Sequence, residues 1–271
     1  MIRWKFGERV VMRRARRAGA REAMALACAA GVFLVASIAQ AQDSNAAAAI
    51  DPKQYAALRW KPVGTSALSA AGAKCDVPAG APRAVANPAG ATHAICADPD
   101  RKGLLYAATT NGVYVSFDDG AHWQSLELNL PLADVRELRV AGDDLLARGA
   151  GQNTWILEDV TPLRQAGTEL DSAAAYLLEP GVATAERGAT IDYYFRAAPK
   201  GEVTIEVRNA QRQIVRSFNS AAGAERLTKK AGLNRLIWNL RDVDGAPVPA
   251  GKYEVMLIGA DTIMKRTLTV Q

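Results

Sequence analysis

Short apolar segments that alternate with turn residues fill the chain from about residue 104 onward, and this pattern limits the fold more than any other feature. Residues 104–109 form one such segment, and the Asn111-Gly112 dipeptide after it is typical of a two-residue hairpin turn. Residues 113–117 are the expected partner strand, and Asp118-Asp119-Gly120 predicts the next turn. Beyond the N-terminal region no stretch has a long 3.6-residue apolar period. We therefore expect an all-β protein with few and short helices.

The expected strands fall into two groups, one on each side of a polar junction. The first group spans residues 95–165, and its short strands recur about every 8–12 residues, as in a propeller blade or a sandwich. The second group spans residues 170–271, where Ile191, Tyr193 and Phe195 alternate with other residues along one strand. Six or seven such strands in about 100 residues predict an Ig-like β-sandwich.

The first 41 residues have the order of a secretory signal peptide. A basic region precedes an apolar run over residues 23–39, and Ala39-Gln40-Ala41 matches a small-residue cleavage site. We predict a signal helix over residues 1–41 that is removed after Ala41, and an exported protein, periplasmic or extracellular. The apolar run is about 17 residues long, so retention as a membrane anchor is the alternative. After cleavage we expect no stable membrane span.

Most of the basic character of the chain lies in this leader. The full chain has a formal net charge of +5, and removal of residues 1–41 takes it to −1. The basic isoelectric point therefore gives no support for nucleic-acid binding. The remaining chain also has no basic stripe with interleaved aromatic residues, so nucleic acid is not an expected partner.

Two cysteines remain after the leader, Cys75 and Cys96. In an oxidising compartment we expect them to form a disulfide, which closes a loop of about 20 residues and adds about 3 kcal/mol of stability. Two unpaired thiols are the alternative. Without a nearby pair of histidines the two cysteines make a poor metal site. Residues 42–94 are otherwise rich in Ala, Gly and Pro, and we expect a flexible lead-in there.

A motif of four spaced residues lies at the turn after residue 115. Residues 116–123 read Ser-Phe-Asp-Asp-Gly-Ala-His-Trp and fit the pattern S-x-D-x-G-x-x-W. This resembles the Asp-box, or bacterial neuraminidase repeat, of the propellers of sialidases, sortilin-like proteins and related glycosidase-like proteins. The resemblance implies a structural role for Ser116, Asp118, Gly120 and Trp123, in which Asp and Gly form the turn and Trp packs beneath it.

The resemblance covers most of residues 55–64 and 95–271. Residues 58–64 are similar to the opening propeller strand of exported bacterial sortilin-like or glycosyl-hydrolase-like proteins, and residues 95–165 to their last blade. Residues 231–253 are similar to an Ig-like domain of the flagellar-hook-capping type. Members of that family carry many blades between the opening strand and the last blade, whereas about 30 residues separate them here. The resemblance thus implies a partial β-propeller of about one blade, followed by an Ig-like sandwich.

A lone blade leaves both of its lateral apolar faces uncovered, because a repeat unit buries its core against its neighbours. We expect this blade to pack on the Ig-like part, or to pair between chains and so form a homo-oligomer.

We assign no catalytic, cofactor-binding or metal-binding residue from the sequence. A propeller glycosidase needs two carboxylates that face each other from different blades, and the chain lacks those blades. Asp98-Pro99-Asp100 and Asp143-Asp144 lack the alternate-residue oxygen spacing of a calcium loop, so we interpret them as turns. His93 and His122 are the only histidines, and no G-x-S-x-G nucleophile elbow is present.

Two adjacent tyrosines offer one route to carbohydrate binding. Tyr193 and Tyr194 follow each other in an expected strand and so point to opposite faces. We expect one in the core and the other exposed, where its ring could stack on a sugar. Trp60, Trp155 and Trp238 are expected in the core.

The sequence favours an exported, non-catalytic binding or interaction module with a protein or carbohydrate ligand. The exposed edge strands of the Ig-like part offer a docking surface. Two alternatives stay open, namely a glycosidase-like protein that binds or hydrolyses carbohydrate, and a folded remnant without activity. Release of sugar from a chromogenic glycoside would identify an enzyme, whereas glycan binding without turnover would support a module.

Overall fold

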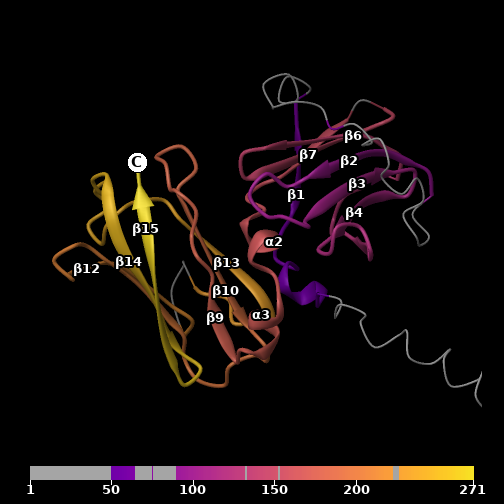
Figure 1. The fold of residues 1–271 in the computed structure, drawn as a ribbon. Helices are drawn as coiled ribbons and strands as arrows, with labels where there is room; N and C mark the ends of the chain where they lie inside the picture. The colour runs from indigo at the N-terminus through magenta and orange to yellow at the C-terminus, as the bar shows by residue number, and fades with distance from the viewer. Residues whose placement is uncertain (1–49, 65–74, 76–89, 132, 152, 222–225) are drawn as a thin grey trace, which may run out of the picture. The chain divides into compact units, whose positions relative to one another are not determined.

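The computed structural model describes residues 50–64, 75, 90–131, 133–151, 153–221 and 226–271. All of them belong to one compact unit, Ala48–Gln271. The predicted signal helix lies outside the described residues, as does most of the lead-in. The described chain is built from four antiparallel sheets (Figure 1), so the predicted all-β class is confirmed.

The N-terminal half contains two four-stranded sheets, where the sequence predicts about one blade. The first is a meander of β2 (Thr92–Ala97), β3 (Leu105–Thr109), β4 (Gly112–Ser116) and β5 (Gln124–Ser125). The second has the order β1 (Trp60–Val63), β8 (Thr154–Leu157), β7 (Asp144–Gly149) and β6 (Val135–Ala141). Each sheet has the strand number and antiparallel order of a propeller blade.

The expected number of sheets was too low for two reasons. The strand β1 is distant in sequence from the other strands of its sheet, yet it pairs with β8 and so completes the second sheet. The strand β2 begins at Thr92, inside the segment that we expected to be a lead-in, and it pairs with β3. Its sequence, Thr-His-Ala-Ile-Cys-Ala, has no clear polar-apolar alternation.

Each of these two sheets packs one of its faces against the other sheet. Their shared core contains side chains from both sheets and from the segments that connect them. The largest fully buried members are Tyr55, Leu58, Trp60, Leu104, Tyr106, Leu126, Leu138, Leu145 and Leu157. One lateral face of the expected blade is therefore covered by a second sheet of the same chain.

Helices are few and short in the described chain, as predicted. The 3-10 helix η1 (Pro52–Gln54) precedes β1, and α2 (Thr161–Gln165) and α3 (Thr168–Ser172) follow β8. Pro lies in the first turn of both η1 and α2, where its fixed φ suits a helix start and its missing N–H costs no hydrogen bond.

The C-terminal half is a sandwich of two sheets around one core. The three-stranded sheet has the order β13 (Gly232–Trp238), β10 (Ala189–Phe195) and β9 (Ala175–Leu177). The four-stranded sheet has the order β12 (Ile214–Asn219), β11 (Thr204–Arg208), β14 (Gly251–Gly259) and β15 (Thr262–Val270). Apart from the short β9, these strands lie where the alternating pattern predicted them.

The three-stranded sheet is covered on its inner face and on part of its outer face, where Ile237 of β13 stays 59% exposed. Its inner face belongs to the sandwich core, and its outer face packs Tyr194 and Leu233 with Leu170 of α3. Tyr193 is 0% exposed and Tyr194 is 2% exposed. The expectation of one exposed tyrosine was wrong, because α3 and neighbouring residues cover the second face around Tyr194.

Candidate functional site

The four residues of the Asp-box-like motif lie together in the turn after β4. The Ser116 hydroxyl accepts a hydrogen bond from the Gly120 N–H at 2.9 Å and donates to Asp118 Oδ1 at 2.8 Å. The Trp123 indole N–H donates to the Gly120 carbonyl at 3.0 Å. Gly120 has φ +88°, a conformation that suits glycine. These contacts account for the turn and leave no polar atom of Ser116 for a ligand.

The exposed part of the same turn carries a hydrogen-bonded pair, Asp118 and His122. Asp118 Oδ2 lies 2.6 Å from Nδ1 of His122, and Asp118 Oδ1 accepts the His122 N–H at 2.9 Å. Partial burial would raise the pKa of Asp118, but the hydrogen bonds from His122 and Ser116 outweigh it and lower that pKa. The other histidine, His93, has Nε2 3.1 Å from Asp134 Oδ1.

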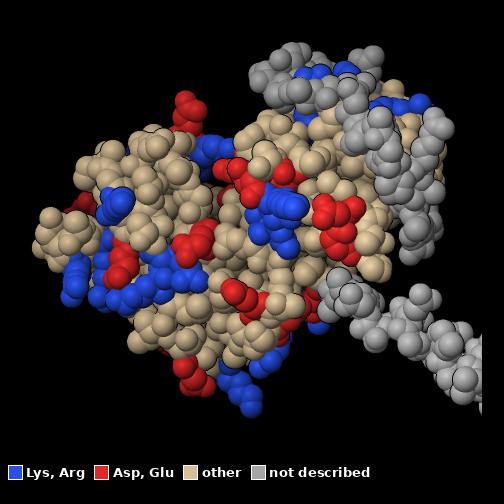
Figure 2. Space-filling model, in the orientation of Figure 1, with Lys and Arg blue, Asp and Glu red and all other residues tan. Residues whose placement is uncertain are grey.

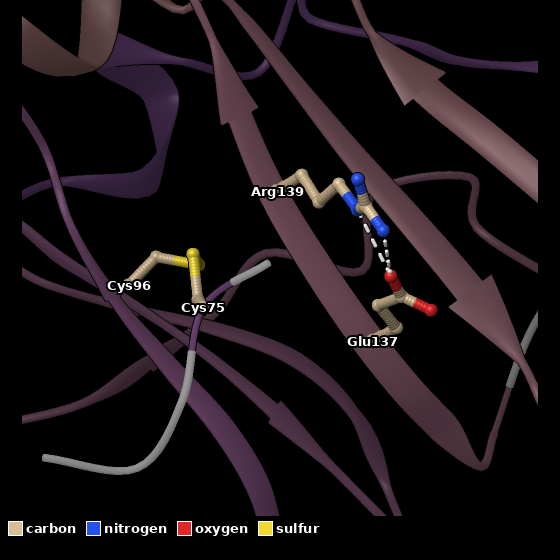
Figure 3. Close-up of a disulfide and its surroundings, with 4 residues drawn as sticks. All are labelled: Cys75, Cys96, Glu137 and Arg139. Atoms are coloured by element: carbon tan, nitrogen blue, oxygen red, sulfur yellow. Dashed lines mark hydrogen bonds and ion pairs between the residues drawn. A yellow bond between two sulfur atoms is a disulfide. The ribbon is translucent and has the colours of Figure 1, made fainter. Parts of the chain in front are cut away.

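The predicted disulfide between Cys75 and Cys96 is present, with an S–S distance of 2.00 Å (Figure 3). Cys96 belongs to β2, and the Cys75 N–H donates to the carbonyl of Leu138 in β6 at 3.3 Å. Strands β2 and β6 contact each other and come from different sheets. The disulfide therefore ties the segment at residue 75 to both of the packed sheets.

An arginine binds the C-terminal end of α2. Arg101 Nη1 donates to the carbonyls of Leu163, Arg164 and Ala166, and its guanidinium lies 5.3 Å from the centre of the Phe117 ring. Those carbonyls have no partner within the helix, so a cation is favourable there. Burial lowers the pKa of Arg101 below its ordinary value.

A second arginine, Arg164, forms ion pairs with three carboxylates that we interpreted from the sequence as turn residues. Arg164 Nε lies 3.0 Å from Asp98, and Arg164 Nη1 lies 3.0 Å from Asp100 and 2.5 Å from Asp143. The Asp98 side chain, which is 0% exposed, also accepts the Tyr106 hydroxyl at 2.9 Å. These acidic residues thus share the largely buried Arg164 as a partner, although the side chains of Asp100 and Asp143 are exposed, which agrees with their interpretation as turn residues.

A buried ion pair joins the sandwich to the end of β8. Arg235 Nη2 lies 2.7 Å from Asp192, and Arg235 also donates to the carbonyls of Glu158 and Asp159 at 3.1 and 3.0 Å. No local sequence pattern predicts this pair. Arg235 follows Asn234 inside an apolar strand, and its register opposite Asp192 appears only when β10 and β13 are paired.

The described chain contains no group of three or more His, Cys, Asp and Glu residues that could hold a metal ion. In the same residues, no helix is long and apolar enough to span a membrane.

Two surface features of the sandwich offer contact sites for a partner, and the first is a groove at one end of it. The groove has a volume of about 360 Å³ and lies between the β11–β12 turn and the segment that enters β14. Its apolar lining includes Val215, Pro247, Val248, Pro249 and Tyr253. Lys252 and Gln211 lie among its polar lining residues. The sequence signal near the groove is Pro249-Ala250-Gly251, which belongs to the segment similar to the flagellar-hook-capping type of Ig-like domain.

The second feature is the outer edge of β15. The Ala183 N–H donates to the Thr269 carbonyl, and the Gln271 N–H donates to the Ala183 carbonyl, both at 2.9 Å. Residues 269 and 271 therefore direct their backbone groups away from β14. Because this direction alternates along an antiparallel strand, Ile263, Lys265 and Thr267 also direct theirs outward.

This edge is open along much of its length. Among the described residues, only one of those outward groups has a hydrogen-bond partner, the Lys265 carbonyl, which accepts from Arg266 Nη1 at 3.0 Å. The side chains of Ile263, Lys265 and Thr267 are exposed, and Ile263 is 63% exposed. An edge of this kind can accept an added strand.

No family model matches the sequence, and no curated protein matches it. Among solved structures, one similar chain is PorZ, a bacterial surface component of the type-IX secretion system of Porphyromonas gingivalis. It shares 18% identity over 67% of this chain and 23% of that chain, with a TM-score of 0.26. Another is the extracellular domain of a hybrid two-component system from B. thetaiotaomicron, with 8% identity over 67% of this chain and 25% of that chain, and a TM-score of 0.20. The chain spans about a quarter of each of these chains, and scores this low carry no argument about its function.

Proposed function

We propose that the chain, once its leader is removed, is an exported and non-catalytic interaction module that adds an extended segment of a partner protein to the edge of β15. The observation that carries this proposal is the open row of backbone groups at Ile263, Lys265 and Thr267. Strand addition draws its affinity from main-chain hydrogen bonds, and exposed side chains beside the edge provide selectivity.

The export part of the proposal rests on the signal-like leader and on the disulfide between Cys75 and Cys96. Disulfides persist in oxidising compartments outside the cytoplasm. An exported chain would meet extracellular or periplasmic proteins, so we propose a partner from that compartment.

A second copy of this chain would pair poorly with the β15 edge in the register centred on Lys265. In a symmetric antiparallel pair centred on Lys265, the two lysines would lie directly opposite each other, and like charges in that position destabilise the pair. Self-association through the N-terminal sheets is a separate prediction. Size-exclusion chromatography with light scattering on residues 42–271 tests it, since a monomer would contradict it.

The edge proposal is tested by panning a phage library of random dodecapeptides on residues 42–271. Thr267→Pro removes one outward N–H without touching the ladder to β14, a position where an edge strand tolerates proline. Thr267→Val keeps that N–H and is the matched control. We expect a class of selected peptides that binds the parent and Thr267→Val equally, and Thr267→Pro at least about tenfold more weakly, or about 1.4 kcal/mol. If every selected peptide binds the folded Thr267→Pro variant as tightly as the parent, the edge proposal is wrong.

A further inference from the structure

We infer that the groove at the end of the sandwich binds a short acidic peptide segment with one aliphatic or aromatic anchor residue. The inference rests on the proposed role as an interaction module, but it uses a surface separate from the β15 edge. The groove lining and the edge residues Ile263, Lys265 and Thr267 have no residue in common.

The size of the groove favours a short segment over a folded domain. Its volume of about 360 Å³ lies at the small end of the range for ligand pockets, about 300–1,000 Å³. Val215 and Val248 pack against the sandwich core and provide an apolar floor. The Tyr253 hydroxyl donates to the Pro249 carbonyl at 2.7 Å, so the ring is held in place and its polar atom is satisfied.

Apolar surface continues beyond the mouth of the groove. The Val243 N–H donates to the carbonyl of Val215 at 3.1 Å, which places Val243 beside the groove lining. Val243 is 65% exposed. An extended peptide that inserts one side chain into the groove would cover Val243 with a neighbouring position.

The loop that forms one wall cannot hold its occupant by strand addition. Pro247 and Pro249 have no backbone N–H, and the Val248 N–H already donates to the Leu240 carbonyl at 2.9 Å. The β15 edge and this groove therefore differ in kind. At the groove, recognition depends on side-chain packing and on charge.

The charges around the groove select an acidic partner. Lys252 lines the groove, and Arg212 and Arg241 lie in the two segments that form it. All three are exposed, and none of them makes an ion pair with a described carboxylate. Figure 2 shows Lys and Arg side chains gathered over β12 and β14, with Asp and Glu among them.

The carboxylates of Asp242, which lines the groove, and of the exposed Asp244 offset part of this positive charge. Asp242 Oδ1 accepts the backbone N–H groups of Asp244 and Ala246 at 3.0 and 2.9 Å, and Arg241 Nη1 donates to the Gly245 carbonyl at 2.7 Å. Three cations against two carboxylates leave an excess of one positive charge on the segments that form the groove. Complementary charge of this kind speeds association and selects partners more than it adds affinity.

The test uses the same panning of random dodecapeptides on residues 42–271, at low salt. We expect a second class of selected peptides in which Asp or Glu flanks a single aliphatic or aromatic residue. Lys252→Glu should weaken this class by at least about tenfold, and raised salt should weaken it further. The matched control is Lys200→Glu, at an exposed lysine that belongs neither to the groove lining nor to the β15 edge.

Two results would overturn the groove proposal. One is the absence of any acidic class among the selected peptides, and the other is an acidic class that binds Lys252→Glu as tightly as the parent. The Thr267→Pro variant distinguishes failure of the groove proposal from failure of the edge proposal. Peptides held in the groove should bind that variant unchanged, whereas peptides added to β15 should not.

Discussion

The side-chain amide of Asn129 bonds both backbone polar groups of Trp60. Oδ1 accepts the Trp60 N–H at 2.8 Å, and Nδ2 donates to the Trp60 carbonyl at 2.9 Å. Asn129 lies in the connection between β5 and β6, so this connection holds the strand that completes the second sheet. One amide thus takes the place of a neighbouring strand at the edge of β1.

We predict that Asn129→Ala destabilises the protein by about 1–3 kcal/mol, because two backbone groups of the 2% exposed Trp60 lose their partners. Asn129→Asp should cost less, since it keeps an acceptor for the N–H. Urea denaturation followed by circular dichroism measures both, with the exposed Asn153→Ala as control. Equal midpoints for Asn129→Ala and Asn153→Ala would show that water replaces the amide.

The expected strands were largely correct because their signal is local. Alternation at Ile191, Tyr193 and Phe195, and the turn at Asn111-Gly112, depend on neighbours in sequence alone. The strand β2 and the pairing of β1 with β8 were not predicted, because they depend on contacts between distant segments. The same reason explains why the β15 edge was only a general expectation and the groove was not found.

The candidate site residues also divide into those with a local sequence signal and those that depend on contacts between distant segments. The Asp-box-like residues lie within eight positions of one another, and the structure brings them together in one turn. The pairing of Cys75 with Cys96 followed from there being two cysteines after the leader. In contrast, the bonds from Arg101 to α2 and from Arg235 to Glu158 span more than 60 residues of chain, and no spacing rule reaches that far.

The disulfide should contribute about 3 kcal/mol, because it closes a loop with a sequence separation of 21 residues. We predict that a variant of residues 42–271 carrying both Cys75→Ser and Cys96→Ser loses about this amount in urea denaturation. Dithiothreitol should lower the stability of the parent to a similar degree and leave the double variant unchanged. A parent that shows no effect of dithiothreitol despite complete reduction would contradict this account.

Ser116 is 0% exposed, and its hydroxyl both accepts from Gly120 and donates to Asp118. We predict that Ser116→Ala costs about 1–3 kcal/mol, since the Gly120 N–H and Asp118 each lose a partner in the turn. Thermal unfolding measures the change, and Ser217→Ala, at an exposed position of β12, is the control. A shift in midpoint no larger than that of the control would mean that the hydroxyl does not hold the turn.

Glu137 of β6 gives the clearest pH dependence. Its side chain is 4% exposed; it bonds Arg139 at 2.8 Å (Figure 3) and also pairs with Arg148. Burial alone would raise the pKa of Glu137, but the hydrogen bonds and charges of the two arginines outweigh it and lower that pKa.

A carboxyl group whose pKa is lower in the folded state stabilises the protein above its unfolded pKa, about 4.3 for Glu, and this contribution is lost as pH falls through the folded value. We predict that Glu137→Gln is less stable than the parent by about 2 kcal/mol at pH 7, because charged hydrogen bonds become neutral ones. The difference between the two proteins should shrink below about pH 4, where the parent carboxyl takes up its proton. Urea denaturation from pH 3 to pH 7 measures this, with the exposed Glu186→Gln as control. Parallel pH profiles for the parent and Glu137→Gln would show that the arginines do not hold Glu137 ionised, and the change at pH 7 would then reflect packing alone.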